Sequence, residues 1–119
     1  MKILVCDDEP SVTEYVVIVL RSEGHEVEAS FDGLEALEKI QADPGLYDVL
    51  ITDNRMPRMS GIELIKELRA LKLPLKIIMI TGFVVQLETA PGDQQLFDRL
   101  LLKPFRAAEL LNCFNELVC

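Results

Sequence analysis

The sequence contains little cysteine, glycine and proline and few basic residues, and each shortage excludes a class of protein. Its three cysteines lie far apart, with no Cys-x-x-Cys or Cys/His pair, so a zinc site is excluded and free thiols in a reducing compartment are expected. Six glycines and six prolines are too few for a collagen-like or low-complexity chain. With 12 Lys and Arg against 20 Asp and Glu, the net charge is −8, so we expect no direct binding of nucleic acid.

Long hydrophobic runs are missing as well. No apolar stretch approaches the ~20 residues that cross a bilayer. The first apolar run, residues 2–6, reaches Asp7 and Asp8 at once, so it does not fit a signal peptide. We therefore expect no membrane contact and a cytoplasmic location. The chain has 119 residues, of which 50% are hydrophobic, so it can bury a core, and we expect a single domain over residues 1–119.

Short apolar runs alternate with segments of helical periodicity along the chain. Asp32 with Glu35, and Ser60 with Glu63, stand in capping-box positions before two of the periodic segments. The runs predict strands at residues 2–6, 26–30, 48–52, 76–80 and 99–102, and the periodic segments predict helices at 12–20, 34–40, 62–71, 83–89 and 107–118. Five strand–helix units in succession indicate a doubly wound α/β fold, with a parallel sheet covered by helices on both faces.

Carboxylates follow two of the predicted strands at their carboxyl ends. Asp7 and Asp8 come after the first strand and Asp53 after the third. Because the carboxyl ends of parallel strands share one edge of the sheet, we expect these side chains to converge there. Clustered carboxylates repel one another or raise one another's pKa unless a cation lies among them, and hard oxygen ligands suit Mg²⁺. The sequence therefore predicts a magnesium site at this edge.

The same edge carries groups suited to phosphoryl transfer. A carboxylate can attack phosphorus and form an aspartyl phosphate, and catalysis then consists mainly of positioning and charge neutralisation. Lys103 after the fifth strand supplies a cation, Thr81 after the fourth supplies a hydroxyl, and Gly82 leaves the approach open. For Glu9, a plain place at the start of the next helix and a role in this cluster stay equally open.

These motifs, taken in order, resemble the response-regulator receiver domains of two-component signalling. The family has an acidic pair after strand one, Asp-x-x-Met-Pro-x-Met-x-Gly after strand three, Thr or Ser and a small residue after strand four, and Lys-Pro-Phe after strand five. This chain has Asp7-Asp8, then DNRMPRMSG at residues 53–61, then Thr81-Gly82, then Lys103-Pro104-Phe105. The match spans nearly the whole chain. It implies a flavodoxin-like (βα)5 fold with strand order 2-1-3-4-5.

The resemblance also implies a role for each acid. Asp53 would accept the phosphoryl group. Asp8 would bind Mg²⁺ directly and Asp7 largely through water, and Asp53 and the backbone carbonyl of Arg55 would complete the protein's share of the ligands. The Arg55 side chain can shield the phosphate or point into solvent, and both readings stay open.

Further roles follow for the residues around the acceptor. Lys103 would pair with the phosphoryl group, Thr81 would move toward it, and the Lys103–Pro104 peptide would be cis. The phosphoryl donor would be a phosphohistidine on a sensor histidine kinase or a histidine phosphotransfer protein. The domain would catalyse only its own phosphorylation and dephosphorylation. His25, the one histidine, precedes the second strand and is expected at the surface, outside the relay.

One departure from the family pattern concerns the switch. Receivers carry Tyr or Phe three residues before the lysine of Lys-Pro-Phe, where this chain has Leu100. Leucine lacks both ring and hydroxyl, so the aromatic half of the switch is missing. Output is then expected through backbone shifts at the face of residues 83–89, 99–102 and 107–118, which is also the face expected in a homodimer.

A second departure lies in the fourth helical segment. Pro91 cannot continue a helix, so the helix expected at 83–89 should be short, and we expect residues 88–97 to be mobile. The segment is also unusually apolar. Its side chains either pack in the core or form an exposed patch for a partner or a dimer, and both readings stay open.

Three other functions compete with a phosphoryl-accepting switch. A haloacid-dehalogenase-type phosphatase would carry Asp-x-Asp after the first strand, whereas Asp7 and Asp8 are adjacent and no cap insertion is present. A flavodoxin-like cofactor module would need a Gly- and Ser/Thr-rich phosphate loop after the first strand. The acids that stand there would repel a phosphate. A receiver fold used only for protein contacts, with weak or altered phosphorylation switching, stays open because of Leu100 and the altered fourth helix.

Overall fold

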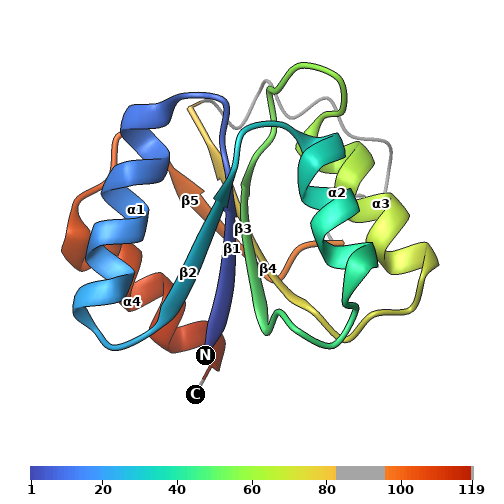
Figure 1. Ribbon diagram of the computed structural model, residues 1–119. Helices are drawn as coiled ribbons and strands as arrows, with labels where there is room; N and C mark the ends of the chain where they lie inside the picture. The colour runs from blue at the N-terminus through green and yellow to red at the C-terminus, as the bar shows by residue number, and fades with distance from the viewer. Residues whose placement is uncertain (83–95, 119) are drawn as a thin grey trace.

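The computed structural model describes residues 1–82 and 96–118. Strands and helices alternate along these residues, as the periodicity predicts (Figure 1). The elements are β1 (Lys2–Cys6), α1 (Pro10–Ser22), β2 (Glu26–Ser30), α2 (Gly33–Ala42), β3 (Val49–Asp53), α3 (Gly61–Ala70), β4 (Lys76–Thr81), β5 (Arg99–Leu102) and α4 (Ala107–Val118). The helix predicted at 83–89, and most of the segment 88–97 expected to be mobile, lie outside the described residues.

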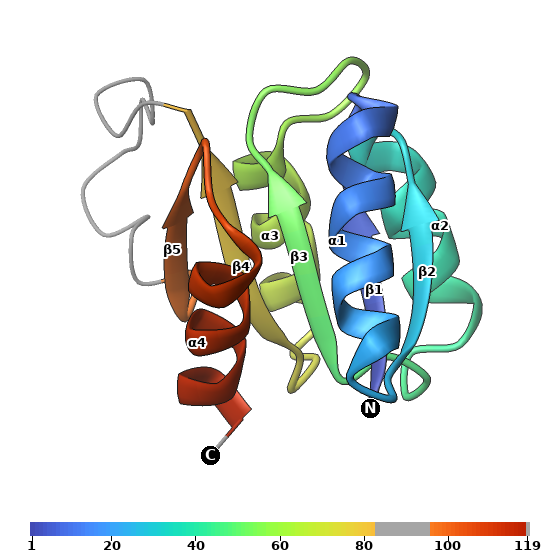
Figure 2. The same ribbon diagram turned by 90° about the vertical axis from the view of Figure 1, so that its left-hand side faces the viewer.

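All five strands form one parallel sheet in the order β2-β1-β3-β4-β5, which confirms the predicted fold class. Helices α1 and α4 cover one face, and α2 and α3 cover the other (Figures 1 and 2). Two strands reach one residue further than predicted, because Asp53 pairs with Ile80 and Thr81 with Leu102 in the ladder. The side chains of Asp53 and Thr81 therefore project from the ends of hydrogen-bonded strands.

Two hydrophobic layers enclose the sheet. Strands β1, β3 and β4 are buried on both faces, so they are apolar almost without interruption, as a covered parallel sheet requires. Along β1, Ile3 and Val5 pack with α1 and α4, whereas Leu4 and Cys6 pack with α2 and α3. This rigid centre fixes the strand ends from which the polar residues project.

The chain passes from β3 to α3 through a loop over residues 54–60. The predicted capping box is present: Ser60 accepts a hydrogen bond from Glu63 N, and the Glu63 carboxylate accepts one from Ser60 N. A Cβ at Gly61 would press on the carbonyl oxygen of Asp53 and lie 3.0 Å from Asn54 Cα, so the turn requires glycine. The end of β3 and the start of α3 are thus in direct contact.

The amino end of α2 lies beside the same turn. The Asp32 carboxylate accepts a hydrogen bond from Glu35 N at 2.8 Å, as predicted for a cap. The second carboxylate oxygen of Asp32 lies 3.3 Å from Arg58 Nη1. The backbone of Arg58 has a positive φ of 69°. This ion pair links α2 to the loop after β3.

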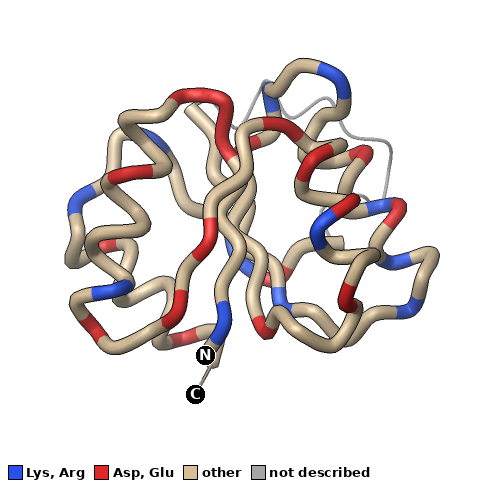
Figure 3. The backbone as a smooth tube through the Cα atoms, viewed as in Figure 1, with Lys and Arg blue, Asp and Glu red and all other residues tan. Residues whose placement is uncertain are grey.

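Among the described residues, no helix combines the length and apolar character needed to span a bilayer. The charged positions lie mainly on the helices, the loops and the strand ends. A run of acidic positions stands where β1 leads into α1 (Figure 3).

Candidate functional site

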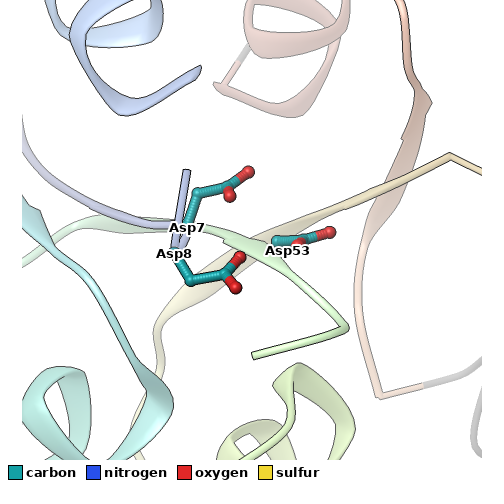
Figure 4. Close-up of side chains that lie close together, drawn as sticks. All are labelled: Asp7, Asp8 and Asp53. Atoms are coloured by element: carbon teal, nitrogen blue, oxygen red, sulfur yellow. The ribbon is translucent and has the colours of Figure 1, made fainter. Parts of the chain in front are cut away.

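Three carboxyl groups meet at the carboxyl edge of the sheet. Asp7 and Asp8 follow β1, and Asp53 ends the neighbouring strand β3 (Figure 4). One oxygen from each lies within 4.8 Å of the others. Asp7 is fully buried, Asp53 is 6% exposed and Asp8 is exposed. The convergence expected from the strand ends is therefore present in the fold.

Lys103 extends into this cluster from the end of β5. Its Nζ lies 2.9 Å from Asp7 Oδ2, 3.6 Å from Asp53 Oδ1 and 3.6 Å from Glu9 Oε1. The backbone N–H of Lys103 donates to the Thr81 carbonyl at 2.8 Å, which continues the β4–β5 ladder. The Lys103–Pro104 peptide bond is cis. The Lys103 ammonium group thus faces three carboxylates at once.

Burial raises the pKa values of two acids of the cluster, Asp53 and Asp7. Burial, followed by the charge of Asp7, raises the pKa of Asp53 from 3.8 to about 6. Burial also raises the pKa of Asp7, although the Glu9 N–H and Lys103 oppose the rise. The negative charges are therefore only partly compensated by Lys103.

One buried oxygen of Asp7 lacks a hydrogen bond among the described residues. Asp7 Oδ1 accepts a hydrogen bond from Glu9 N at 2.9 Å. Asp7 Oδ2 has Lys103 as its ion-pair partner, yet it accepts no well-formed hydrogen bond from the described residues. Because a buried acceptor left without a hydrogen bond is costly, this oxygen fits a site built for a further cation or its water. Carboxylate oxygens are ligands that suit Mg²⁺. The residues present therefore fit the ion inferred from the sequence.

Most of the predicted site residues line one pocket of about 320 Å³. Thr81 ends β4 and is buried, Gly82 follows it, and Arg55 contributes an exposed side chain. The lining consists of Asp8, Glu9, Asp53, Arg55, Thr81, Gly82 and Lys103. Asp7 is fully buried beside it.

Two of the predicted residues lie elsewhere. Pro104 lines an adjoining pocket with Ser11, Tyr15 and Phe105. Leu100 is half-buried and packs against the α2–α3 side of the core, away from the carboxylates. His25 lies at the opposite edge of the sheet and is half-buried rather than fully exposed, because its ring packs on Phe114 with centroids 4.8 Å apart.

The structure also reveals supporting residues that the sequence analysis does not single out. Asn54 Oδ1 accepts a hydrogen bond from Ile62 N at 3.1 Å, next to Asp53. Arg58 joins the loop to Asp32. Neither contact leaves a local signal in the sequence, since both depend on how the elements pack.

The chain matches the family model "Response regulator receiver domain" over residues 3–115. It is 32% identical over 117 residues to the response regulator receiver protein CpdR of Brucella abortus, covering 98% of this chain and 96% of that one. It is 35% identical over 111 residues to the transcriptional regulatory protein DltR of Streptococcus agalactiae, covering 93% of this chain and 49% of that protein. The chain therefore spans about half the length of DltR.

The chain is also similar to solved structures of response regulators. The response regulator TrrA of Thermotoga maritima, in complex with Mg²⁺ and BeF, has a TM-score of 0.86 at 34% identity, with 98% of each chain covered. The chemotaxis response regulator CheY4 of Vibrio cholerae has a TM-score of 0.83 at 34% identity, again with 98% of each chain covered.

Proposed function

Since this chain belongs to the response regulator receiver domain family, we propose that it accepts a phosphoryl group on Asp53 in a Mg²⁺-dependent reaction. The donor is a phosphohistidine of a sensor histidine kinase or a histidine phosphotransfer protein. The observation that carries this proposal is the cluster of Asp7, Asp8 and Asp53 beside Lys103. Residues 1–119 act as a single receiver domain in this proposal.

Three carboxylates and one carbonyl would hold the metal ion. They are Asp8, Asp53, Asp7 through water, and the backbone carbonyl of Arg55. When bound, Mg²⁺ supplies positive charge beside the phosphoryl oxygens. The raised pKa of Asp53, about 6, leaves its carboxylate mainly ionised at pH 7 and so available as a nucleophile.

The remaining residues of the pocket position the transferred group. A carboxylate oxygen of Asp53 attacks phosphorus as the bond to the donor imidazole nitrogen breaks, and the electron pair of that bond returns to the nitrogen. Lys103, 3.6 Å from Asp53 Oδ1, pairs with a phosphoryl oxygen. The Thr81 hydroxyl donates a hydrogen bond to another phosphoryl oxygen, and Gly82 leaves the entry open.

Phosphorylation then shifts an equilibrium between two conformations. The new group adds about −1.5 to −2 charge at pH 7, which draws Thr81 and the end of β4 toward Asp53. In this proposal, output passes through a face that includes β5 and α4, which also forms the homodimer; the third segment expected in this face lies outside the described residues. Because Leu100 replaces the family's aromatic residue, this output depends on backbone shifts of β4 and β5.

We also propose where the domain works and which activities it lacks. The domain works in the cytoplasm, consistent with its free cysteines Cys6 and Cys113. It catalyses only its own phosphorylation and dephosphorylation, and it does not bind DNA directly, consistent with its net charge of −8.

A second candidate is a receiver fold that serves protein contacts with weak phosphorylation switching. The position of Leu100 favours it, because this side chain packs on the core and brings no hydroxyl to the switch. The two candidates differ in whether the chain becomes labelled.

The test is labelling by acetyl phosphate with and without Mg²⁺, followed by mapping of the modified residue by mass spectrometry. We expect Mg²⁺-dependent labelling of Asp53 and none in Asp53→Asn. The matched control is Asp48→Asn, just before the start of the same strand, where an amide oxygen can still accept from Lys2 N. Labelling that persists in Asp53→Asn would refute the acceptor assignment.

A further inference from the structure

Glu9 stands at the amino end of α1 without serving as its cap. It occupies the N-cap position, where a side-chain oxygen would ordinarily accept from the first turn of the helix, yet it forms no such hydrogen bond. Its side chain is 62% exposed, and its Oε1 lies 3.6 Å from Lys103 Nζ. Of the two readings that the sequence leaves open, the contact with Lys103 is the one present in the fold.

Lys103 is therefore shared among three acids with different surroundings. Asp7 is fully buried and lies nearest, at 2.9 Å, and Asp53 is the proposed acceptor at 3.6 Å. Glu9 is the exposed member and lines the pocket that a phosphoryl group would enter. A phosphoryl group on Asp53 needs the Lys103 cation and brings negative charge close to Glu9.

Resting on the proposed function, we propose that Glu9 is a positioning residue that competes with the phosphoryl group for Lys103. In the unphosphorylated domain, the Glu9 carboxylate holds the ammonium group toward the pocket mouth. When Asp53 carries a phosphoryl group, Lys103 leaves Glu9, and the Glu9 charge repels the new dianion. Both effects lower the affinity of the pocket for a phosphoryl group and so favour the unphosphorylated state.

The geometry separates this role from that of a metal ligand. The described acids whose oxygens lie within 4.8 Å of one another are Asp7, Asp8 and Asp53, and Glu9 is outside this set. Removing the Glu9 charge should therefore alter phosphoryl binding more than metal binding.

The experiment compares the full chain with Glu9→Gln. Beryllofluoride serves as the phosphoryl probe at saturating Mg²⁺, and isothermal titration calorimetry measures its binding because the chain has no tryptophan to report it by fluorescence. Since exposed charge pairs contribute modestly, we expect beryllofluoride to bind about threefold more tightly to Glu9→Gln. The gain should shrink in 1 M KCl, because salt screens exposed charges. A merely structural role would not depend on salt in this way.

The matched control is Glu23→Gln, which removes the same charge at the other end of α1. We expect it to bind beryllofluoride as the wild type does. Equal affinities of Glu9→Gln and the wild type would overturn the role of Glu9, and so would a loss of Mg²⁺ affinity beyond tenfold, which would make Glu9 a ligand. A wild-type chain that binds Mg²⁺ but no beryllofluoride would instead refute the phosphoacceptor function, and the inference with it.

Discussion

At the scale of single residues, the site is an unfavourable arrangement of charge held by a rigid sheet. Asp7 and Asp53 are almost fully buried, and one lysine faces both. The raised pKa values of these acids mean that the folded state disfavours their ionised forms. Because ionised Asp7 and Asp53 destabilise the folded state, removing one charge or adding a cation should make the fold more stable.

The first prediction is that Asp53→Asn stabilises the metal-free protein. A folded-state pKa of about 6, above the ordinary 3.8, makes the ionised carboxylate destabilising at pH 7. We expect the substitution to raise the free energy of unfolding by about 1 kcal/mol, or the unfolding midpoint by about 4 °C. Circular dichroism during heating in EDTA measures this change.

The control for this prediction is Asp48→Asn, which removes an exposed acid that lies just before the start of β3. It should leave the midpoint unchanged or lower it. A lower midpoint for Asp53→Asn than for the wild type would contradict the prediction.

At the scale of elements, two helix starts support the loop after β3. The amino end of α2 contacts it through the Asp32–Arg58 ion pair, and α3 begins directly behind Asp53 at Gly61. The loop therefore depends on close backbone contacts as well as on hydrogen bonds.

The second prediction concerns Gly61→Ala. Its Cβ would press on the Asp53 carbonyl oxygen, and because the atoms that it would meet are all backbone, relief requires the loop to move. We expect a loss of more than about 2 kcal/mol in urea unfolding, together with weaker Mg²⁺ binding. Gly45→Ala is the matched control, since a Cβ there meets no atom within 4 Å. Equal stability of the two variants would show that the turn is free to adjust.

A second contact between elements predicts a pH dependence. Tyr47, just before β3, donates a hydrogen bond to Glu28 of β2, and Lys2 of β1 lies 3.2 Å from the same carboxylate. The hydrogen bond from Tyr47 is the main cause of the lowered pKa of Glu28, with Lys2 adding to it. A lowered folded-state pKa stabilises the fold above the ordinary value of 4.5, and this stability is lost as the pH falls through the folded-state pKa.

The third prediction is therefore that Tyr47→Phe costs about 1 kcal/mol of unfolding free energy at pH 7 and less at pH 3. Urea unfolding at the two pH values measures the difference. Tyr15→Phe, which removes a hydroxyl from the exposed side of α1, should show no such pH dependence. A cost for Tyr47→Phe that is equal at both pH values would exclude the charged hydrogen bond as its source.

At the scale of the whole molecule, the acidic cluster would link metal binding to folding. The three carboxylates lie at the ends of two strands and are brought together only by the folded sheet, so an ion bound there would favour the folded state.

The fourth prediction is that Mg²⁺ raises the unfolding temperature. At 100 times its dissociation constant, a ligand adds about 2.7 kcal/mol to the free energy of unfolding. Differential scanning calorimetry with and without MgCl2, at matched ionic strength, measures the shift. Asp8→Asn should lose most of it, whereas Asp48→Asn should keep it. A shift of equal size in Asp8→Asn would place the ion elsewhere.

Much of this architecture could be predicted from the sequence because its signals are local or follow from topology. Strand bounds agreed to within one residue, since apolar runs and polar ends mark them, and Ser60 with Glu63 formed the predicted capping box. The surface position expected for His25 was only half right, because Phe114 of a distant helix covers its ring.

The sequence alone determined that the chain forms a doubly wound parallel sheet and that acids, a hydroxyl and a lysine meet at one edge. Parallel strands must all end on the same side, so residues after them converge whatever the details of packing. Only the tertiary structure decided which groups pair: Lys103 with Asp7 and Glu9, Arg58 with Asp32, and Tyr47 with Glu28. These pairings depend on strand register, on helix placement and on how far side chains extend between elements distant in the chain. A charge pair forms or fails over a few ångströms, which no sequence pattern specifies.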